Sequence, residues 1–312
     1  MQSKFFILLL GLFLPNSFLI LQPLSAKPIG FVTANYFIGS SEPTLIAQVP
    51  SSSEMTKAVK LFKSGSYADS VSIFSRIISA PNSGRSTKNK ALVARAQAFI
   101  VLGQPALALL DLNKVTYDND ELNLTAELHL IRGTTYIQLT DYKSAVTELS
   151  KSIAISSDEA SAYANRAVAY QALGDLSSAR SDLNISLDID PIPSTVYNLA
   201  VLEKTIGNYK RCYFLLSRLS ESDYAYADVF IQQALCAESM GNVDEALKNF
   251  LRAASLDNTN PLVLKKIGTI VANAGDKKTG IRYLERASEI YLTNGSIPEY
   301  TNILEVLENL RK

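Results

Sequence analysis

The stretch from Ala126 to Pro191 contains one pattern twice: AELHLIRGTTYIQLTDYKSAVTELSKSIAISSDE (126–159) is followed by ASAYANRAVAYQALGDLSSARSDLNISLDIDP (160–191). A shift of 34 residues aligns small and bulky residues in the same order, so that Gly133, Tyr136, Ala145 and Leu149 recur as Ala167, Tyr170, Ala179 and Leu183. Within each copy the apolar residues return at spacings of three and four. This periodicity predicts helices that are buried along one side.

The positions of the small residues predict how these helices pack. Gly133 and Ala145 allow the two helices of a hairpin to approach closely, while Tyr136 and Leu149 fill the space beside the contact. A single hairpin cannot bury its whole apolar face, so each hairpin must stack on a neighbour. The residue types, their order and the 34-residue period resemble the tetratricopeptide repeat family. The resemblance implies an all-α fold, a right-handed solenoid of antiparallel helix pairs whose first helices line a concave groove.

Weaker copies of the pattern extend through the rest of the chain. Aligning the hairpin turns predicts about seven units, with turns at Gly65, Gly103, Thr140, Gly174, Gly207, Gly241 and Gly275. We therefore expect a repeat array over residues 54–292 and an amphipathic capping helix over 293–312. Ser296 followed by Glu299 predicts a capping box for that last helix. Gly280 falls inside a predicted helix, where it should cost about 1 kcal/mol relative to alanine, and this indicates very close helix packing.

The N-terminus has the composition of an export signal. Lys4 precedes an apolar run, and Ser25 and Ala26 offer a small-residue cleavage site, so residues 1–26 are expected to be a signal peptide. The alternative is an uncleaved membrane anchor, because residues 5–24 are just long enough to span a bilayer. Residues 27–53 are predicted to be a linker, within which Leu45–Gln48 is a second candidate processing site. The expected protein is of the exported bacterial type, in the periplasm or an equivalent extracytoplasmic compartment, with membrane anchoring as the alternative.

Composition excludes several classes of function. The 30 Lys and Arg residues balance the 30 Asp and Glu residues, which is unlike the basic footprint of a nucleic-acid-binding protein. The single histidine, His129, falls at a bulky packing position, and the sequence contains no phosphate-binding loop and no metal-binding or redox motif. We therefore expect no nucleic-acid partner, no cofactor, no metal and no catalytic activity.

The two cysteines, Cys212 and Cys236, both lie within predicted helices. Cys212 occupies a position that holds alanine or glycine in other units. Packing as a small apolar side chain is therefore favoured for it, although an exported protein could join the pair in a disulfide.

A groove that binds a protein segment remains as the predicted functional site. The residues two positions before the first small residue of successive units form a row, which we call the amide row: Ile131, Asn165, Asn198, Gln232 and Lys266. Three amides in succession could donate and accept hydrogen bonds along an extended peptide, and Tyr197, Val168, Val201 and Leu235 would add apolar contacts. The alternative is that these amides are structural.

The sequence thus predicts a non-catalytic scaffold or assembly factor that binds a partner segment in the concave groove. The rival hypothesis is a regulatory or docking subunit of an envelope enzyme complex, which would use its convex face or its N-terminal anchor. The identity of the partner and the oligomeric state stay open.

Overall fold

The computed structural model describes residues 53–116, 122–222 and 225–312, and within these ranges the chain forms fifteen helices and no strand. The predicted signal peptide or anchor (1–26) and nearly all of the predicted linker (27–53) lie outside the described residues. The helices form seven antiparallel pairs and one last single helix: α3 (Ser53–Lys63) with α4 (Tyr67–Ser79), α5 (Arg85–Val101) with α6 (Pro105–Leu112), α7 (Leu122–Gln138) with α8 (Tyr142–Ile155), α9 (Ala160–Ala172) with α10 (Leu176–Ile189), α11 (Pro193–Thr205) with α12 (Tyr209–Ser220), α13 (Ala227–Ser239) with α14 (Val243–Leu256), α15 (Pro261–Asn273) with α16 (Lys277–Thr293), and α17 (Ile297–Arg311).

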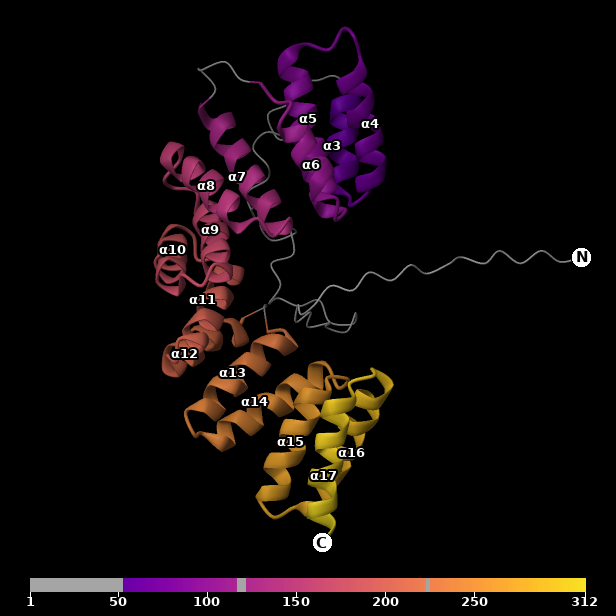
Figure 1. The fold of residues 1–312 in the computed structure, drawn as a ribbon, viewed down its shortest axis with the longest axis vertical. Coiled ribbons are helices and arrows are strands. Elements are labelled where there is room, and N and C mark those ends of the chain that lie inside the picture. The colour runs from indigo at the N-terminus through magenta and orange to yellow at the C-terminus, as the bar shows by residue number, and fades with distance from the viewer. Residues whose placement is uncertain (1–52, 117–121, 223–224) are drawn as a thin grey trace, which may run out of the picture.

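The pairs follow one another along an open arc (Figure 1). Each helix packs on its hairpin partner, and the second helix of a pair also packs on the first helix of the next pair. In the middle of the arc α8, α10 and α12 form the outer layer, while α7, α9 and α11 form the inner layer. The predicted all-α solenoid with a final capping helix is confirmed.

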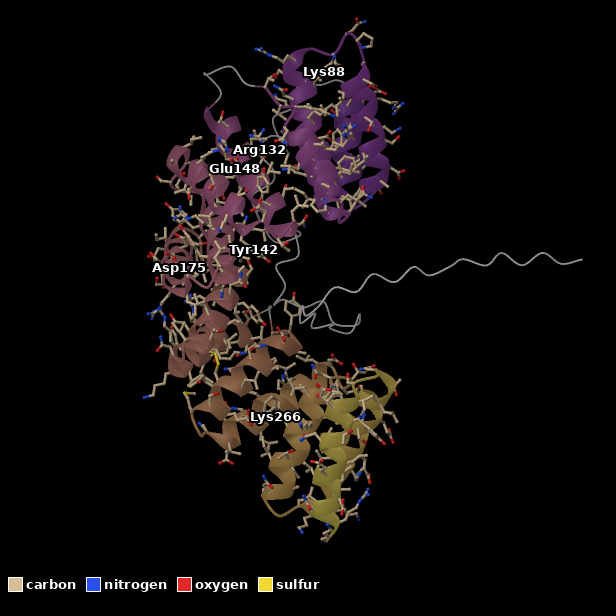
Figure 2. The ribbon with its side chains drawn as sticks, in the orientation of Figure 1. Lys88, Arg132, Tyr142, Glu148, Asp175 and Lys266 are labelled. Atoms are coloured by element: carbon tan, nitrogen blue, oxygen red, sulfur yellow. A yellow bond between two sulfur atoms is a disulfide. The ribbon has the colours of Figure 1, made fainter. Side chains whose placement is uncertain are left out.

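Every predicted hairpin turn has a left-handed backbone. Gly65, Gly103, Gly174, Gly207, Gly241 and Gly275 all have positive φ, and Thr140 is the one non-glycine residue with positive φ among the described residues. Glycine adopts this conformation without steric cost. The next helix then starts from a side-chain cap in several units, for example at Asp175, whose carboxylate accepts from the Ser178 backbone N–H at 3.0 Å (Figure 2).

The small residues lie where helices touch. Ala145, Ala179 and Ala246 are completely buried. A Cβ atom added to Gly280 would lie 2.6 Å from Cβ of Ala272 and 2.7 Å from the carbonyl oxygen of Gly268. The sequence prediction of unusually close packing at Gly280 is therefore confirmed, because α15 and α16 approach too closely there for any side chain.

The last helix covers the end of the array, but its predicted capping box does not form. Ile303 and Leu307 of α17 are buried in a cluster with Leu284 and Ala287 of α16. Ser296 is the N-cap residue, yet its side chain makes no capping hydrogen bond.

The two cysteines form a disulfide, which corrects the prediction that they only fill space. Cys212 of α12 and Cys236 of α13 are completely buried, with Cα atoms 6.3 Å apart. α12 packs against α13, the first helix of the next unit, and this packing brings the two cysteines within bonding distance. The bond joins two successive repeat units covalently.

Candidate functional site

The amide row lies on the first helices of five successive units, but the structure buries more of it than expected. Asn165 is 0% exposed, Asn198 is 9% exposed and Tyr197 is 1% exposed, whereas Gln232 and Lys266 are half-buried. A peptide contact needs an accessible side chain, and Asn165 and Tyr197 are almost completely buried, while Asn198 exposes only a small part of its surface. The physical reason is that most of these polar groups bond to the neighbouring first helix.

Asn165 joins α9 to α7. Its Nδ2 donates to Thr134 Oγ1 at 3.0 Å, and the Thr134 hydroxyl donates in turn to the Leu130 carbonyl at 2.9 Å. Asn165 Oδ1 is buried and makes no hydrogen bond with the described residues. A completely buried amide that holds two helices together has a structural role, which agrees with the alternative interpretation of the row.

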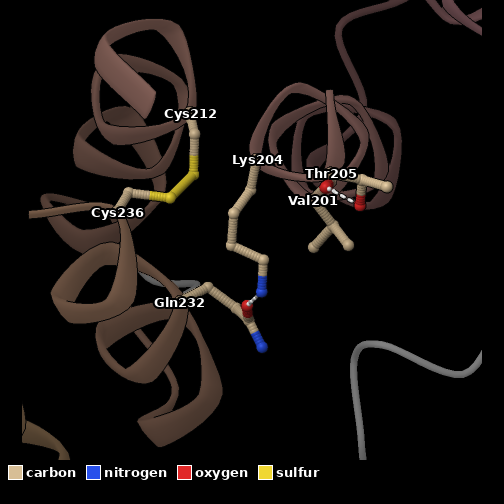
Figure 3. The surroundings of a disulfide bond; sticks show 6 residues. All are labelled: Val201, Lys204, Thr205, Cys212, Gln232 and Cys236. Carbon is tan, nitrogen blue, oxygen red and sulfur yellow. Dashed lines mark hydrogen bonds between the residues drawn. A yellow bond between two sulfur atoms is a disulfide. The ribbon is translucent and has the colours of Figure 1, made fainter. Parts of the chain in front are cut away.

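Gln232 and Lys266 also form contacts between units. Gln232 of α13 accepts a hydrogen bond from the ammonium of Lys204 on α11 (Figure 3). Lys266 of α15 (Figure 2) forms an ion pair with Glu238 of α13, at 2.6 Å between Nζ and Oε2. The row therefore contributes polar links between α7 and α9, between α11 and α13, and between α13 and α15.

Tyr197 extends this series. Its hydroxyl donates to the Asp228 carboxylate, which lies on the next first helix, α13. Burial, together with the negative charge of Asp228, raises the pKa of Tyr197 far above its usual value. Burial lowers the pKa of Lys204, and the attraction of Asp228 opposes that shift. Asp228 and Lys204 therefore form one local group of opposite charges around the α11–α13 contact.

Sequence reasoning missed Lys204, Asp228 and Glu238. A signal was present, because Lys204 and Glu238 each lie six residues after a member of the amide row. Following each helix for a second turn would have found Lys204 and Glu238, whereas nothing in the sequence pattern pointed to Asp228. Their pairing with residues 28 positions away follows from the stacking of the units.

Asn198 differs from the other polar members of the row. Its amide makes no hydrogen bond with another described residue. A second row lies three residues after the amide row on each of the same helices. Its two end members are threonine and its three middle members are apolar: Thr134, Val168, Val201, Leu235 and Thr269. We call Val168, Val201 and Leu235 the apolar strip. All three are half-buried, so the middle of the inner face offers an apolar surface beside one unpaired amide.

The outer layer offers a different kind of surface. Phe214 of α12 is 62% exposed. An open cavity of about 410 Å³ lies among α12, α13 and α14, where Phe230 and Leu251 contribute apolar surface and Arg252 contributes a cation.

His129 lies apart from the inner row and has a charged neighbour. Its Nδ1 is 2.8 Å from Glu148 Oε2. Burial of Glu148 opposes ionisation, but hydrogen bonds from Lys151 and His129 outweigh it and lower the pKa of Glu148. Among the described residues no group of three His, Cys, Asp or Glu side chains is placed to hold a metal ion. In the same ranges no helix combines the length and apolarity needed to cross a bilayer.

Comparison with known proteins identifies the repeats. The family model described as "Tetratricopeptide repeat" matches residues 126–159, 160–193 and 227–260. The BBSome complex member BBS4 of Xenopus tropicalis is 29% identical over 101 residues, which are 32% of this chain and 20% of that protein. The mouse protein of the same name is 24% identical over 119 residues, 38% of this chain and 22% of that protein. The matches thus span about a fifth of the length of these curated relatives.

Two solved structures share the fold. YrrB, whose structure is described as a TPR protein with an unusual peptide-binding site, has a TM-score of 0.51 at 17% identity, over 59% of this chain and 92% of its own. MamA from Desulfovibrio magneticus RS-1 has a TM-score of 0.51 at 16% identity, over 54% of this chain and 96% of its own. The repeat pattern, the helix pairs and these similarities agree: residues 126–193 and 227–260 are tetratricopeptide repeats, and the chain has the fold of tetratricopeptide repeat proteins.

Proposed function

We propose that this protein is a non-catalytic scaffold or assembly factor that binds a segment of a partner protein on the inner face of α7–α15. The observation that carries the proposal is the apolar strip of Val168, Val201 and Leu235 beside the unpaired amide of Asn198. Apolar surface with a few polar groups that fix orientation is typical of binding sites. The description of YrrB as having a peptide-binding site supports the same use of the fold.

The surrounding contacts suit this role because they hold the groove in one shape. Asn165, Gln232 and Lys266 bond to neighbouring first helices, and the disulfide fixes α13 to α12. Figure 3 shows that Cys236 leaves α13 toward Cys212, whereas Gln232 leaves it toward Lys204 of α11. A site that is already ordered loses less conformational entropy on binding, so more of the contact energy appears as affinity.

The disulfide and the N-terminal composition support an extracytoplasmic site of action. A buried disulfide is typical of proteins that fold in an oxidising compartment, and residues 1–26 have the composition of a signal peptide. We propose that the protein works in the periplasm or an equivalent compartment, with a membrane tether through residues 5–24 as the alternative. N-terminal sequencing of the protein from its native cells distinguishes the two, because cleavage gives a chain that begins near Lys27.

A second candidate function is a docking subunit of an envelope enzyme complex that uses the outer layer. Two separate features favour it: the exposed side chain of Phe214, and the open cavity bordered by Phe230 and Leu251. Exposed apolar surface and hollows that accept an anchor side chain are typical of contact sites.

Site-specific photo-cross-linking in native cells tests the two functions against each other. A photoreactive diazirine amino acid replaces Val168 on the inner face or, as the matched control, Phe214 on the outer layer. The proposed function predicts that the partner is cross-linked through position 168 and not through position 214. Capture through position 214 alone would contradict it and support the docking subunit.

A further inference from the structure

The balanced charge of the whole chain is the sum of two unequal parts. Residues 53–116, which form the first two units, contain nine Lys and Arg residues but only three Asp and Glu residues. Residues 117–312 contain 19 basic and 26 acidic residues. The first two units therefore have a net charge of +6, and the rest of the array has a net charge of −7. Such an asymmetry directs the basic end of a molecule toward an anionic partner.

The fold gathers several of these cations at one end of the first helix pair. Because successive helices are antiparallel and packed on each other, the start of α3, the end of α4 and the start of α5 lie together. Arg76 of α4 accordingly forms an ion pair with Glu54 of α3, at 3.4 Å, and Figure 2 shows Lys88 near the turn between α4 and α5. Lys60 follows Lys57 by three residues, so the two lie side by side on α3. We call the following group of cations the basic surface: Lys57, Lys60, Arg76, Arg85 and Lys88.

Few carboxylates neutralise the basic surface. Glu54 is the one acidic residue of α3 and is already paired, while Asp69 lies at the start of α4, at the opposite end of the helix pair. Lys57 and Lys60 are exposed, and neither they nor Lys88 form an ion pair with another described residue. The basic surface therefore keeps a positive field, which is screened by water and dissolved salt.

An exposed leucine lies at the same end of these helices. The chain returns to the start of α5 after α6, because the Asn89 side chain donates a hydrogen bond to the Thr116 carbonyl. The last turn of α6 therefore also lies at this end, and its Leu110 is 58% exposed. Cations beside an exposed apolar side chain are typical of a surface that rests on a bilayer, where the cations meet anionic headgroups and the apolar side chain enters the boundary of the acyl chains.

We infer that the basic surface docks on the anionic lipid headgroups of a membrane. The order of the chain favours this partner over nucleic acid, because the apolar segment 5–24 and the predicted linker lead into α3, which carries Lys57 and Lys60. A membrane tether through that segment would hold the basic surface next to the same bilayer. Each Lys or Arg near an anionic membrane strengthens binding about fivefold. The basic surface lies outside α7–α15, so this docking is separate from partner binding on the inner face.

Lysine footprinting of the full-length protein tests the inference. A water-soluble acylating reagent is added to the protein with phosphatidylcholine vesicles, or with vesicles that also contain phosphatidylglycerol, and mass spectrometry gives the reaction rate of each lysine. We expect Lys57, Lys60 and Lys88 to react several-fold more slowly with the anionic vesicles, and this protection to fade as salt is added. Lys277 and Lys278, which are exposed on α16 in the last unit, should react equally with both. Equal rates with the two kinds of vesicle at Lys57, Lys60 and Lys88 would overturn the inference.

Two matched variants show whether the cations themselves cause the protection, with Lys88 as the reporter. Lys57→Gln with Lys60→Gln removes two cations and should weaken docking by roughly 25-fold, so that Lys88 loses most of its protection. Lys277→Gln with Lys278→Gln removes the same charge from α16 and should leave Lys88 protected. All four lysines are exposed, so both variants should keep the fold, which circular dichroism checks. Unchanged protection of Lys88 in the first variant would overturn the inference, as would stronger protection by duplex DNA than by the anionic vesicles.

Discussion

Replacing both Cys212 and Cys236 with alanine removes the covalent link between α12 and α13 while disturbing the packing little. Other units carry alanine or glycine at the position of Cys212, and both cysteines are completely buried. The two residues are 24 apart in sequence. A cross-link that closes a loop of this length restricts the unfolded chain by about 3.5 kcal/mol in the chain-entropy model. The double variant should therefore be less stable than the oxidised protein by roughly this amount.

Urea denaturation followed by circular dichroism measures the effect, for wild type and variant, each with and without reductant. Oxidised wild-type protein should unfold at the highest urea concentration. Reduced wild type and the double variant should unfold together at a lower one, since both lack the link. Identical midpoints for oxidised and reduced wild type, together with two titratable thiols in the native protein, would show that the disulfide does not form.

Two further predictions concern the repeat framework. Gly280→Ala should lower the melting temperature, because the added methyl group would overpack against Ala272 and Gly268. Overpacking costs about 1–3 kcal/mol, which outweighs the roughly 1 kcal/mol that alanine gains over glycine at an open helix position. A rise in melting temperature would contradict the close contact. Three aspartates cap helices through hydrogen bonds from a residue three positions later, and these bonds lower the pKa of each carboxylate: Asp141, Asp175 and Asp276. A carboxylate whose pKa is lower in the folded state stabilises the protein above its unfolded pKa, near 3.9, and loses this effect as the pH falls through the folded value. Replacing all three with asparagine, which caps α14 at Asn242, should therefore flatten the fall in melting temperature between about pH 4 and pH 2, and an unchanged acid profile would refute the role of these caps.

The fold could be predicted from the sequence because its signals are local. The left-handed turn glycines, such as Gly174 and Gly241, occur at a regular interval and mark the end of each first helix. Gly280 indicated a close helix contact, because a glycine inside a helix destabilises the helix unless the packing requires it. Periodicity, the turn glycines and the resemblance to tetratricopeptide repeats together predicted the helix pairs and the final helix.

The candidate site was only partly predictable, because the burial and the hydrogen-bond partners of its residues depend on contacts between units. Helical phase placed Asn165 and Tyr197 on the first helices, but their burial depends on partners 31 residues away, Thr134 and Asp228. The disulfide depends in the same way on how α12 packs against α13. A single sequence gives the spacing along one helix, whereas these interactions depend on the distance between helices.

The central claim is that the inner face of the middle repeats binds the partner, and paired affinity measurements test it most directly. Val168→Asp places a carboxylate in the apolar strip, and Phe214→Asp places the same group on the outer layer. Binding of each full-length variant to the cross-linked partner, measured by calorimetry alongside thermal unfolding, separates loss of binding from loss of fold. The account predicts at least about a tenfold loss of affinity for Val168→Asp, equivalent to 1.4 kcal/mol, with a melting temperature close to wild type and normal binding by Phe214→Asp. Normal binding by Val168→Asp, together with lost binding by a folded Phe214→Asp, would contradict it.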